Sequence, residues 1–368
     1  MHLNSTIYPK NEIAGRPKSD DFCLLETRKE VESSPDFIRS VKELAQELHL
    51  RHIRRWRCEV TVTNGVTVHC EGRIVFMDVE CLQHLLTKEE RAAFDRDGFM
   101  VVENALPDSM VKDLNKAMDR IDGAVDFVGK DDLFLELVDW PTVFPKVFGI
   151  LGWNIHIYHT VALARPPDSE EKRRQKARLA WHQDSDRVNA DIAPGPTMRI
   201  SLKVGYLLTD LPKKGYGNQL FIPGSHLKRE LEWPADGLSN PEGVYTLQAP
   251  AGSAVLFEQR VWHTGSPNLS DITRKTLYYG YSYRWFHPRD DRTVSHYMER
   301  SDPIRKQLLG AKTKALGLTS PQPEEVPLRA WMEEHLGEEA VTDKYTRLVG
   351  GTSVSFARNP DDHYAVRA

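Results

Sequence analysis

The chain has 368 residues, of which 40% are hydrophobic and 9% aromatic, so it can bury a core and is not globally disordered. Its net charge of −4 provides no positive field over the surface, and we expect no nucleic-acid partner. No apolar run is long enough to cross a membrane, residues 1–5 lack a signal pattern, and the four cysteines form no CxxC pair. We therefore expect a reduced, cytoplasmic protein without a membrane partner.

The N-terminal extension carries two local signals. Apolar residues recur at spacings of three and four over residues 36–50, which predicts an amphipathic helix. Two β-branched runs around Asn64-Gly65 then predict a hairpin. With a two-residue turn, Glu59 lies opposite Cys70 and Cys58 points to the other face, so this register does not predict a Cys58–Cys70 disulfide.

A helix, strand and helix follow the extension. Thr87 and Glu90 have capping-box spacing, which predicts that a helix begins there and ends near Gly98. Residues 99–102 predict a short strand, and the apolar spacing after Pro107 predicts a second amphipathic helix.

The middle of the chain is rich in short β-type runs separated by proline and glycine. We expect a mainly β protein with flanking helices, whose core is an antiparallel sandwich or jelly roll that can hold a metal between two sheets. The predicted strands are Ile155–Leu163, Met198–Leu208, Gln219–Ile222, Ala254–Phe257 and Thr276–Trp285. The predicted domains are an α+β extension (1–85), a β core (86–290) and a helical C-terminal extension packed on the core (291–368).

A set of metal-ligand residue types spans this β region. His182 and Asp184 are two residues apart, so on an extended strand both side chains point to one face. With His263 they would form a two-histidine, one-carboxylate set that leaves three positions of an iron(II) ion open. Arg274 offers a rigid fork of donors that suits the distal carboxylate of 2-oxoglutarate.

Each of these residues also has a simpler interpretation. An isolated His-x-Asp arises by chance in a chain of this length, His263 could be a core histidine beside Trp262, and Arg274 an ordinary edge-strand arginine. Their joint occurrence in this order favours the metal site. Four other histidines are weaker candidates for ligands: His156, His159, His226 and His287.

Several motifs in order resemble the phytanoyl-CoA dioxygenase family of iron(II)- and 2-oxoglutarate-dependent oxygenases, over roughly residues 86–285. Phe94–Val102 resembles the opening segment of that family, and Trp181–Asp184 resembles its metal-binding motif. Gly217–His226 is similar to the turn-strand-turn of the family, and His263–Asn268 is similar to its distal segment.

The resemblance implies a double-stranded β-helix, a cupin-like jelly roll. It also implies that His182, Asp184 and His263 are the catalytic iron ligands and that Arg274 binds the cosubstrate. It further suggests cofactor-binding roles for three residues: Ser266, Tyr206 and His159. His159 and Tyr206 depart from the residues that the family often has there.

The expected activity is that of a 2-oxoglutarate-dependent dioxygenase, which consumes O2 and releases succinate and CO2. Hydroxylation of an aliphatic carbon of a small molecule is the leading hypothesis. The same cofactors could support desaturation, cyclisation or demethylation, and a non-catalytic jelly-roll binding protein is the alternative from another class. The sequence identifies neither the substrate nor the oligomeric state.

Overall fold

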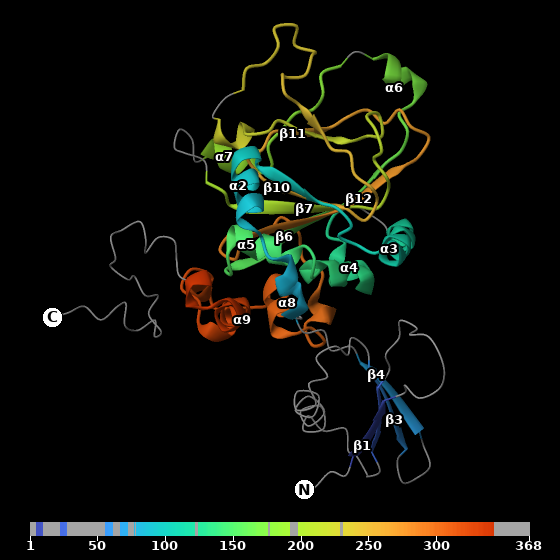
Figure 1. Ribbon diagram of the computed structural model, residues 1–368, viewed down its shortest axis with the longest axis vertical. Coiled ribbons are helices and arrows are strands. Elements are labelled where there is room, and N and C mark those ends of the chain that lie inside the picture. Colours follow the sequence, from blue (N-terminus) through green and yellow to red (C-terminus); the bar gives the residue numbers. More distant parts are fainter. Residues whose placement is uncertain are drawn as a thin grey trace, which may run out of the picture. The chain divides into compact units, whose positions relative to one another are not determined.

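The computed structural model describes residues 5–9, 23–27, 56–61, 67–72, 77 and 79–341, except 122–123, 176, 192–197 and 229–230 (Figure 1). The chain divides into two compact units. The smaller comprises Met1–Asp78 with Glu299–Asp302, and the larger comprises Val79–Met298 with Pro303–Ala368.

The smaller unit contains a four-stranded sheet in the order β1-β2-β3-β4. Its strands are β1 (Ser5–Pro9), β2 (Cys23–Thr27), β3 (Trp56–Thr61) and β4 (Thr67–Gly72). The antiparallel β3–β4 pair confirms the predicted hairpin, but the predicted register is wrong, because Cys58 lies opposite Cys70 and Thr61 opposite Thr67. An odd number of residues, 62–66, joins the strands, and this shifts the pairing by one residue relative to a two-residue turn. The helix predicted over 36–50 lies outside the described residues.

Two antiparallel sheets form the β part of the larger unit. The first has the order β5-β10-β7-β12-β6, with β5 (Phe99–Val102), β6 (Ile155–Arg165), β7 (Ser201–Leu207), β10 (Ala254–Glu258) and β12 (Arg274–Tyr283). The second has the order β11-β8-β9, with β8 (Gln219–Phe221), β9 (Tyr245–Thr246) and β11 (His263–Gly265). The five strands predicted in the middle of the chain are confirmed. The sequence did not predict β9 and β11, which have two and three residues.

Helices flank these sheets. The predicted first helix is α2 (Lys88–Asp97), where Thr87 and Glu90 form the reciprocal cap and Gly98 closes the C-terminus at a φ of 83°. The others are α3 (Asp108–Arg120), α4 (Asp132–Glu136), α5 (Phe144–Leu151), α6 (Glu170–Arg174), α7 (Asp186–Asp191), α8 (Pro303–Leu308) and α9 (Pro327–Leu336). Short 3₁₀ turns lie at Val79–His84, Val128–Lys130, Leu137–Asp139, Ser225–Leu227, Ser295–Tyr297, Ala315–Leu318, Pro323–Glu325 and Glu338–Ala340. Within the described ranges, no helix has the length and apolarity needed to cross a bilayer.

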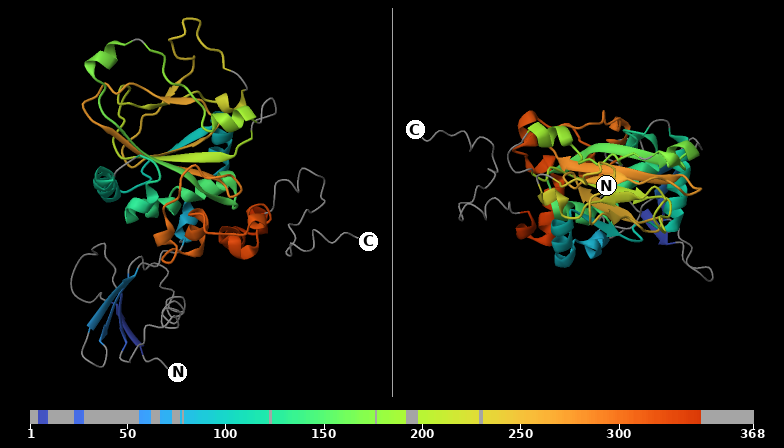
Figure 2. Two further views of the ribbon diagram at one scale, coloured as in Figure 1. Left: turned by 180° about the vertical axis from the view of Figure 1, so that it is seen from behind. Right: turned by 90° about the horizontal axis from the view of Figure 1, so that it is seen from above.

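The five-stranded sheet has two different faces. Helices α3, α4 and α5 lie along one face, and the strand β11 lies on the other side of the sheet (Figures 1 and 2). On the helix-covered face, three tyrosine hydroxyls donate to backbone carbonyls: Tyr206 to Leu137, Tyr279 to Phe134 and Tyr281 to Val138. Since side chains alternate along a strand, the neighbours of these tyrosines on β7 and β12 point toward the second sheet.

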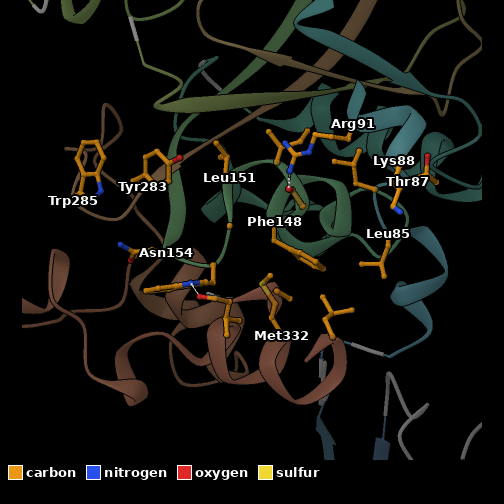
Figure 3. A pocket seen from close by; sticks show the side chains of 18 of the residues that line it. Leu85, Thr87, Lys88, Arg91, Phe148, Leu151, Asn154, Tyr283, Trp285 and Met332 are labelled. Carbon is orange, nitrogen blue, oxygen red and sulfur yellow. Dashed lines mark hydrogen bonds between the residues drawn. The ribbon is translucent and has the colours of Figure 1, made fainter. Parts of the chain in front are cut away.

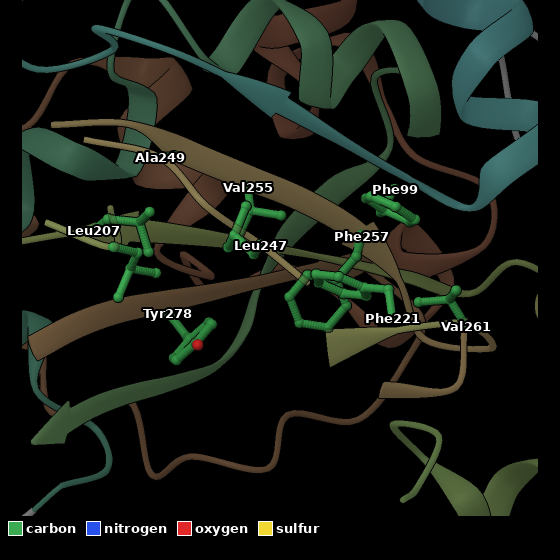
Figure 4. Close-up of a cluster of buried hydrophobic side chains, with 10 residues drawn as sticks. Phe99, Leu207, Phe221, Leu247, Ala249, Val255, Phe257, Val261 and Tyr278 are labelled. Carbon is green, nitrogen blue, oxygen red and sulfur yellow. The ribbon is translucent and has the colours of Figure 1, made fainter. Parts of the chain in front are cut away.

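The hydrophobic core of the larger unit fills the space between the two sheets (Figure 4). Phe99 of β5 stacks on Phe221 of β8 with ring centroids 4.5 Å apart. Phe257 of β10 packs edge-on against the same Phe221 ring at 5.3 Å. The imidazole of His263 lies 4.8 Å from Phe257, so the core continues directly into the wall of the predicted metal site.

A separate cavity of about 900 Å³ lies between α5, α9 and the start of α2 (Figure 3). Its wall includes Phe148, Leu151, Met332 and Trp285. It shares no lining residue with the pocket that His182 and His263 line, and the two pockets are therefore distinct.

Candidate metal centre

Three of the predicted site residues converge in the larger unit. His182, Asp184 and His263 each offer a ligand atom, and these atoms lie within 4.8 Å of one another. His263 Nε2 is 4.0 Å from Asp184 Oδ2, and the two imidazole centroids are 4.4 Å apart. A pair of backbone hydrogen bonds between His182 and His263, at 3.0 and 3.1 Å, joins the two chain segments at this point.

The backbone at the His-x-Asp motif differs from the predicted extended strand. Only His182 takes part in β pairing, as a single bridge, and Asp184 already lies in a turn. Ser185 has a φ of 56°, and α7 begins at the next residue. The turn, rather than the alternation of a strand, therefore brings the carboxylate to the histidines.

Both histidines have their Nδ1 atoms engaged. His182 Nδ1 lies 2.9 Å from the Ala180 carbonyl, and His263 Nδ1 lies 2.9 Å from the Val261 carbonyl. Because a carbonyl can only accept, Nδ1 carries the proton and Nε2 keeps its lone pair for a metal. Burial lowers the pKa of His263 to about 4 although the Asp184 charge acts in the opposite direction, so this imidazole is neutral at pH 7.

Asp184 is buried, with 6% of its surface exposed, and its two oxygens have different surroundings. Lys203 Nζ donates to Oδ1 at 2.8 Å, whereas Oδ2 is buried and has no hydrogen-bond partner. Burial alone would raise the pKa of Asp184, but the charge of Lys203 and its hydrogen bond hold it below its usual value. An ionised carboxylate with one open oxygen, beside two imidazole nitrogens, fits the donor set that iron(II) takes in oxygenases.

A pocket of about 210 Å³ opens beside this centre, and His182 and His263 are among its lining residues. Arg274 also lines it and is only 3% exposed. Arg274 Nη1 donates to the Gly217 carbonyl at 2.6 Å, while its Nε is buried without a partner. The guanidinium is thus held in place and keeps donor capacity for an acid.

A second guanidinium lines the same pocket. Arg165 lies opposite Arg274 in the β6–β12 register, and its Nη1 would be only 2.5 Å from a Cβ atom at Gly265. Its Nε is also buried without a hydrogen bond. With Lys203, the pocket is lined by three cationic side chains, a setting that attracts a dicarboxylate.

The structure does not bring the other predicted cofactor-binding residues to this pocket. Tyr206 lies on the opposite face of the sheet, where its hydroxyl donates to Leu137. His159 places Nδ1 2.6 Å from an oxygen of Asp290. Ser266 follows the lining residue Gly265, but its own hydroxyl is 3.4 Å from the Pro267 carbonyl and it does not line the pocket.

Lys203 and Tyr278 line the pocket, and the sequence did not single them out. The Tyr278 hydroxyl donates to Gln219 at 3.1 Å and receives a long contact of 3.4 Å from Arg274. The signal for Lys203 was present in the sequence, because a lysine within the apolar run Ser201–Leu207 needs a buried acidic partner.

Two imidazoles and a carboxylate that could hold one ion, beside a pocket lined by a buried arginine, are the side-chain set expected of a mononuclear non-haem iron enzyme that uses a 2-oxo acid. The family model for phytanoyl-CoA dioxygenase (PhyH) matches residues 150–276, a range that contains the histidine and carboxylate positions and Arg274. This match supports the family resemblance that the motifs predicted. The chain is a 2-oxoglutarate-dependent dioxygenase, with Fe(II) and 2-oxoglutarate as its cofactors.

Comparison with individual proteins finds distant relatives. The ectoine dioxygenase of Bordetella parapertussis is 22% identical over 241 residues, which is 54% of this chain and 75% of the relative. Dioxygenase af480 of Aspergillus fumigatus is 25% identical over 142 residues, covering 38% of this chain and 41% of the relative. The crystal structure of HygX from Streptomyces hygroscopicus with nickel and 2-oxoglutarate is 18% identical, with a TM-score of 0.47 over 55% of this chain and 89% of HygX.

Proposed function

We propose that the chain hydroxylates an aliphatic carbon of a small molecule, with His182, Asp184 and His263 as the iron ligands and Arg274 as the anchor of 2-oxoglutarate. The observation that carries the proposal is the buried, unpartnered Oδ2 of Asp184, which lies 4.0 Å from His263 Nε2. A buried charged atom without a partner is costly, and a cation held jointly with the histidines removes that cost.

When bound, iron and 2-oxoglutarate supply the oxidation: 2-oxoglutarate and O2 become succinate and CO2, and one oxygen atom enters a C–H bond of the substrate. The residues of the chain position these partners. His182 and His263 present Nε2 because carbonyls hold their Nδ1 protons, and the fixed guanidinium of Arg274 receives the distal carboxylate. Phe257 beside His263 keeps the metal side of the pocket apolar and limits the access of water.

The larger unit is, in this proposal, a double-stranded β-helix. Its two antiparallel sheets with a hydrophobic core between them support that architecture, as does the site at the edge of the same core. We further propose residues 1–85 and 291–368 as extensions of the catalytic core 86–290, and a cytoplasmic location. The ectoine dioxygenase relative, by its name, acts on a small molecule, which supports the same class of substrate here.

The test is succinate formation by the purified, iron-loaded protein with 2-oxoglutarate and a broad panel of small molecules. We expect hydroxylated product and substrate-dependent succinate from the wild type, and loss of both from His182→Ala and Asp184→Ala. His287→Ala is the matched control, because this histidine is exposed and its Nδ1 lies 2.7 Å from the Pro288 carbonyl. Wild-type turnover in Asp184→Ala, or desaturated product in place of alcohol, would contradict the proposal.

A further inference from the structure

Lys203 occupies an unusual position for a lysine. It lies on β7, the central strand of the five-stranded sheet, and its side chain is only 14% exposed. It points to the face that carries the metal centre and is one of the residues that line the pocket. A lysine at such a place costs desolvation energy that an apolar residue would avoid, so a specific partner is needed to stabilise it.

That partner is the carboxylate of the proposed metal site. Lys203 Nζ lies 2.8 Å from Asp184 Oδ1, and the two side chains are 14% and 7% exposed. Within the described part of the chain, no other carboxylate forms an ion pair with Lys203. The contact is also selective between the oxygens, because Oδ2 is left without any hydrogen bond.

The selectivity has a chemical consequence for the site. A carboxylate with two free oxygens can hold a metal ion through both of them, which takes one more coordination position than binding through one oxygen. A two-histidine, one-carboxylate site works only when it leaves positions open for the 2-oxo acid and O2. We propose that Lys203 is a positioning residue that occupies Asp184 Oδ1, so that only Oδ2 binds the iron and the position needed by 2-oxoglutarate stays open.

The inference rests on the proposed metal site, and its test separates the two. Lys203→Met removes the ammonium and keeps most of the side-chain volume, whereas Lys203→Arg keeps a cationic donor. Lys275→Met is the matched control, because Lys275 is 16% exposed on the neighbouring strand β12 and pairs with Asp119 outside the pocket. Manganese binding by calorimetry, and the visible absorption of the anaerobic iron(II) protein titrated with 2-oxoglutarate, report on the site without turnover.

We expect Lys203→Met to bind manganese but to lose at least tenfold in its affinity for 2-oxoglutarate. Lys203→Arg should recover most of this loss, and Lys275→Met should match the wild type. A crystal structure of Lys203→Met with manganese should show both oxygens of Asp184 on the metal. Wild-type affinity for 2-oxoglutarate in Lys203→Met, or one bound oxygen in that structure, overturns the inference. Failure of the wild type to bind any metal would instead overturn the proposed function.

A second measurement covers the case in which Lys203→Met folds poorly. If the lysine acts through Asp184, the stability losses of Lys203→Met and Asp184→Asn are coupled, because each leaves the other buried group unpaired. The double variant should then be at least as stable to heat as Lys203→Met alone. Simple addition of the two losses would overturn the inference.

Discussion

The larger unit contains two buried carboxylates, and their ion pairs differ in how many carboxylate oxygens they occupy. Asp139 and Asp184 are 7% and 6% exposed, and each faces a cation from a distant part of the chain. Arg305 of α8 donates to both oxygens of Asp139, with Nε at 3.1 and 3.2 Å. Lys203 reaches only one oxygen of Asp184. The first pair is complete and can only hold the fold together, whereas the second leaves one charged atom for a further cation.

The largest effect should come from breaking the complete pair. Arg305→Met leaves Asp139 buried without its counter-charge, and we expect the free energy of unfolding to fall by about 3–5 kcal/mol. Denaturant unfolding measures this loss. At a temperature where the variant is still folded, its affinity for 2-oxoglutarate should equal that of the wild type. A change in that affinity would contradict the separation of the two carboxylates into structural and functional sites.

The next effect concerns the open site. Arg274→Met removes the fixed guanidinium, and since the loss of a buried charged partner costs about 2–5 kcal/mol, the KM for 2-oxoglutarate should rise by at least about 30-fold. Initial rates of succinate formation measure the change. Tyr206→Phe is the control, because its hydroxyl lies on the opposite face of the sheet and contributes only a 3.4 Å contact. A KM shift in Tyr206→Phe, or none in Arg274→Met, would contradict this placement of the cosubstrate.

A smaller effect should appear as a pH dependence of stability, caused by a histidine that does not line the pocket. Burial, with the nearby charge of Arg292, lowers the pKa of His156 from 6.5 to about 3. As the pH falls below 6.5, His156 binds a proton in the unfolded chain but not in the folded chain. This histidine therefore does not reduce the free energy of unfolding above pH 6.5, and it lowers that free energy below pH 6.5 by up to about 1.4 kcal/mol per pH unit. Arg292 donates to Nδ1, which must keep its lone pair, whereas the Phe286 carbonyl accepts from Nε2 and acts on the pKa in the opposite direction.

Urea midpoints between pH 7.5 and 5 measure this dependence. His156→Gln should show a flatter curve than the wild type, while the exposed His287→Gln should follow the wild type. The buried His263 contributes in the same direction, so the variant retains part of the slope. Identical curves for His156→Gln and the wild type would contradict the neutral, buried state of this histidine.

Much of the site was predictable because its chemistry requires particular residue types. Only a few side chains can bind iron(II), so the order His182, Asp184, His263 in the sequence restricts the choice of ligands. The turn at Ser185 was not predictable, since a motif does not specify how the backbone presents it. Lys203 was missed because its partner is 19 residues away in the chain and only the packing of β7 brings the two together.

The fold also has features that local sequence patterns predict and features that depend on contacts between distant residues. The cap formed by Thr87 and Glu90 is local, and the sequence predicted the start of α2 correctly. The register of Cys58 and Cys70 depends on the length of a loop, and one residue more or less reverses the face of every side chain. The Asp139–Arg305 pair spans 166 residues of sequence, beyond the reach of any local pattern. Local rules therefore predict where elements begin, and long-range packing decides which atoms meet.

Gly265 has no side chain, and this allows the charged side chain of Arg165 to lie beside it. The space that a methyl group would fill there is taken by Arg165, whose Nη1 lies 2.5 Å from the position of that methyl carbon. An alanine at this position would force the guanidinium aside without removing it. The number of charges would stay constant while their arrangement around the acid changed, which makes this glycine a point at which selectivity among related 2-oxo acids could be adjusted.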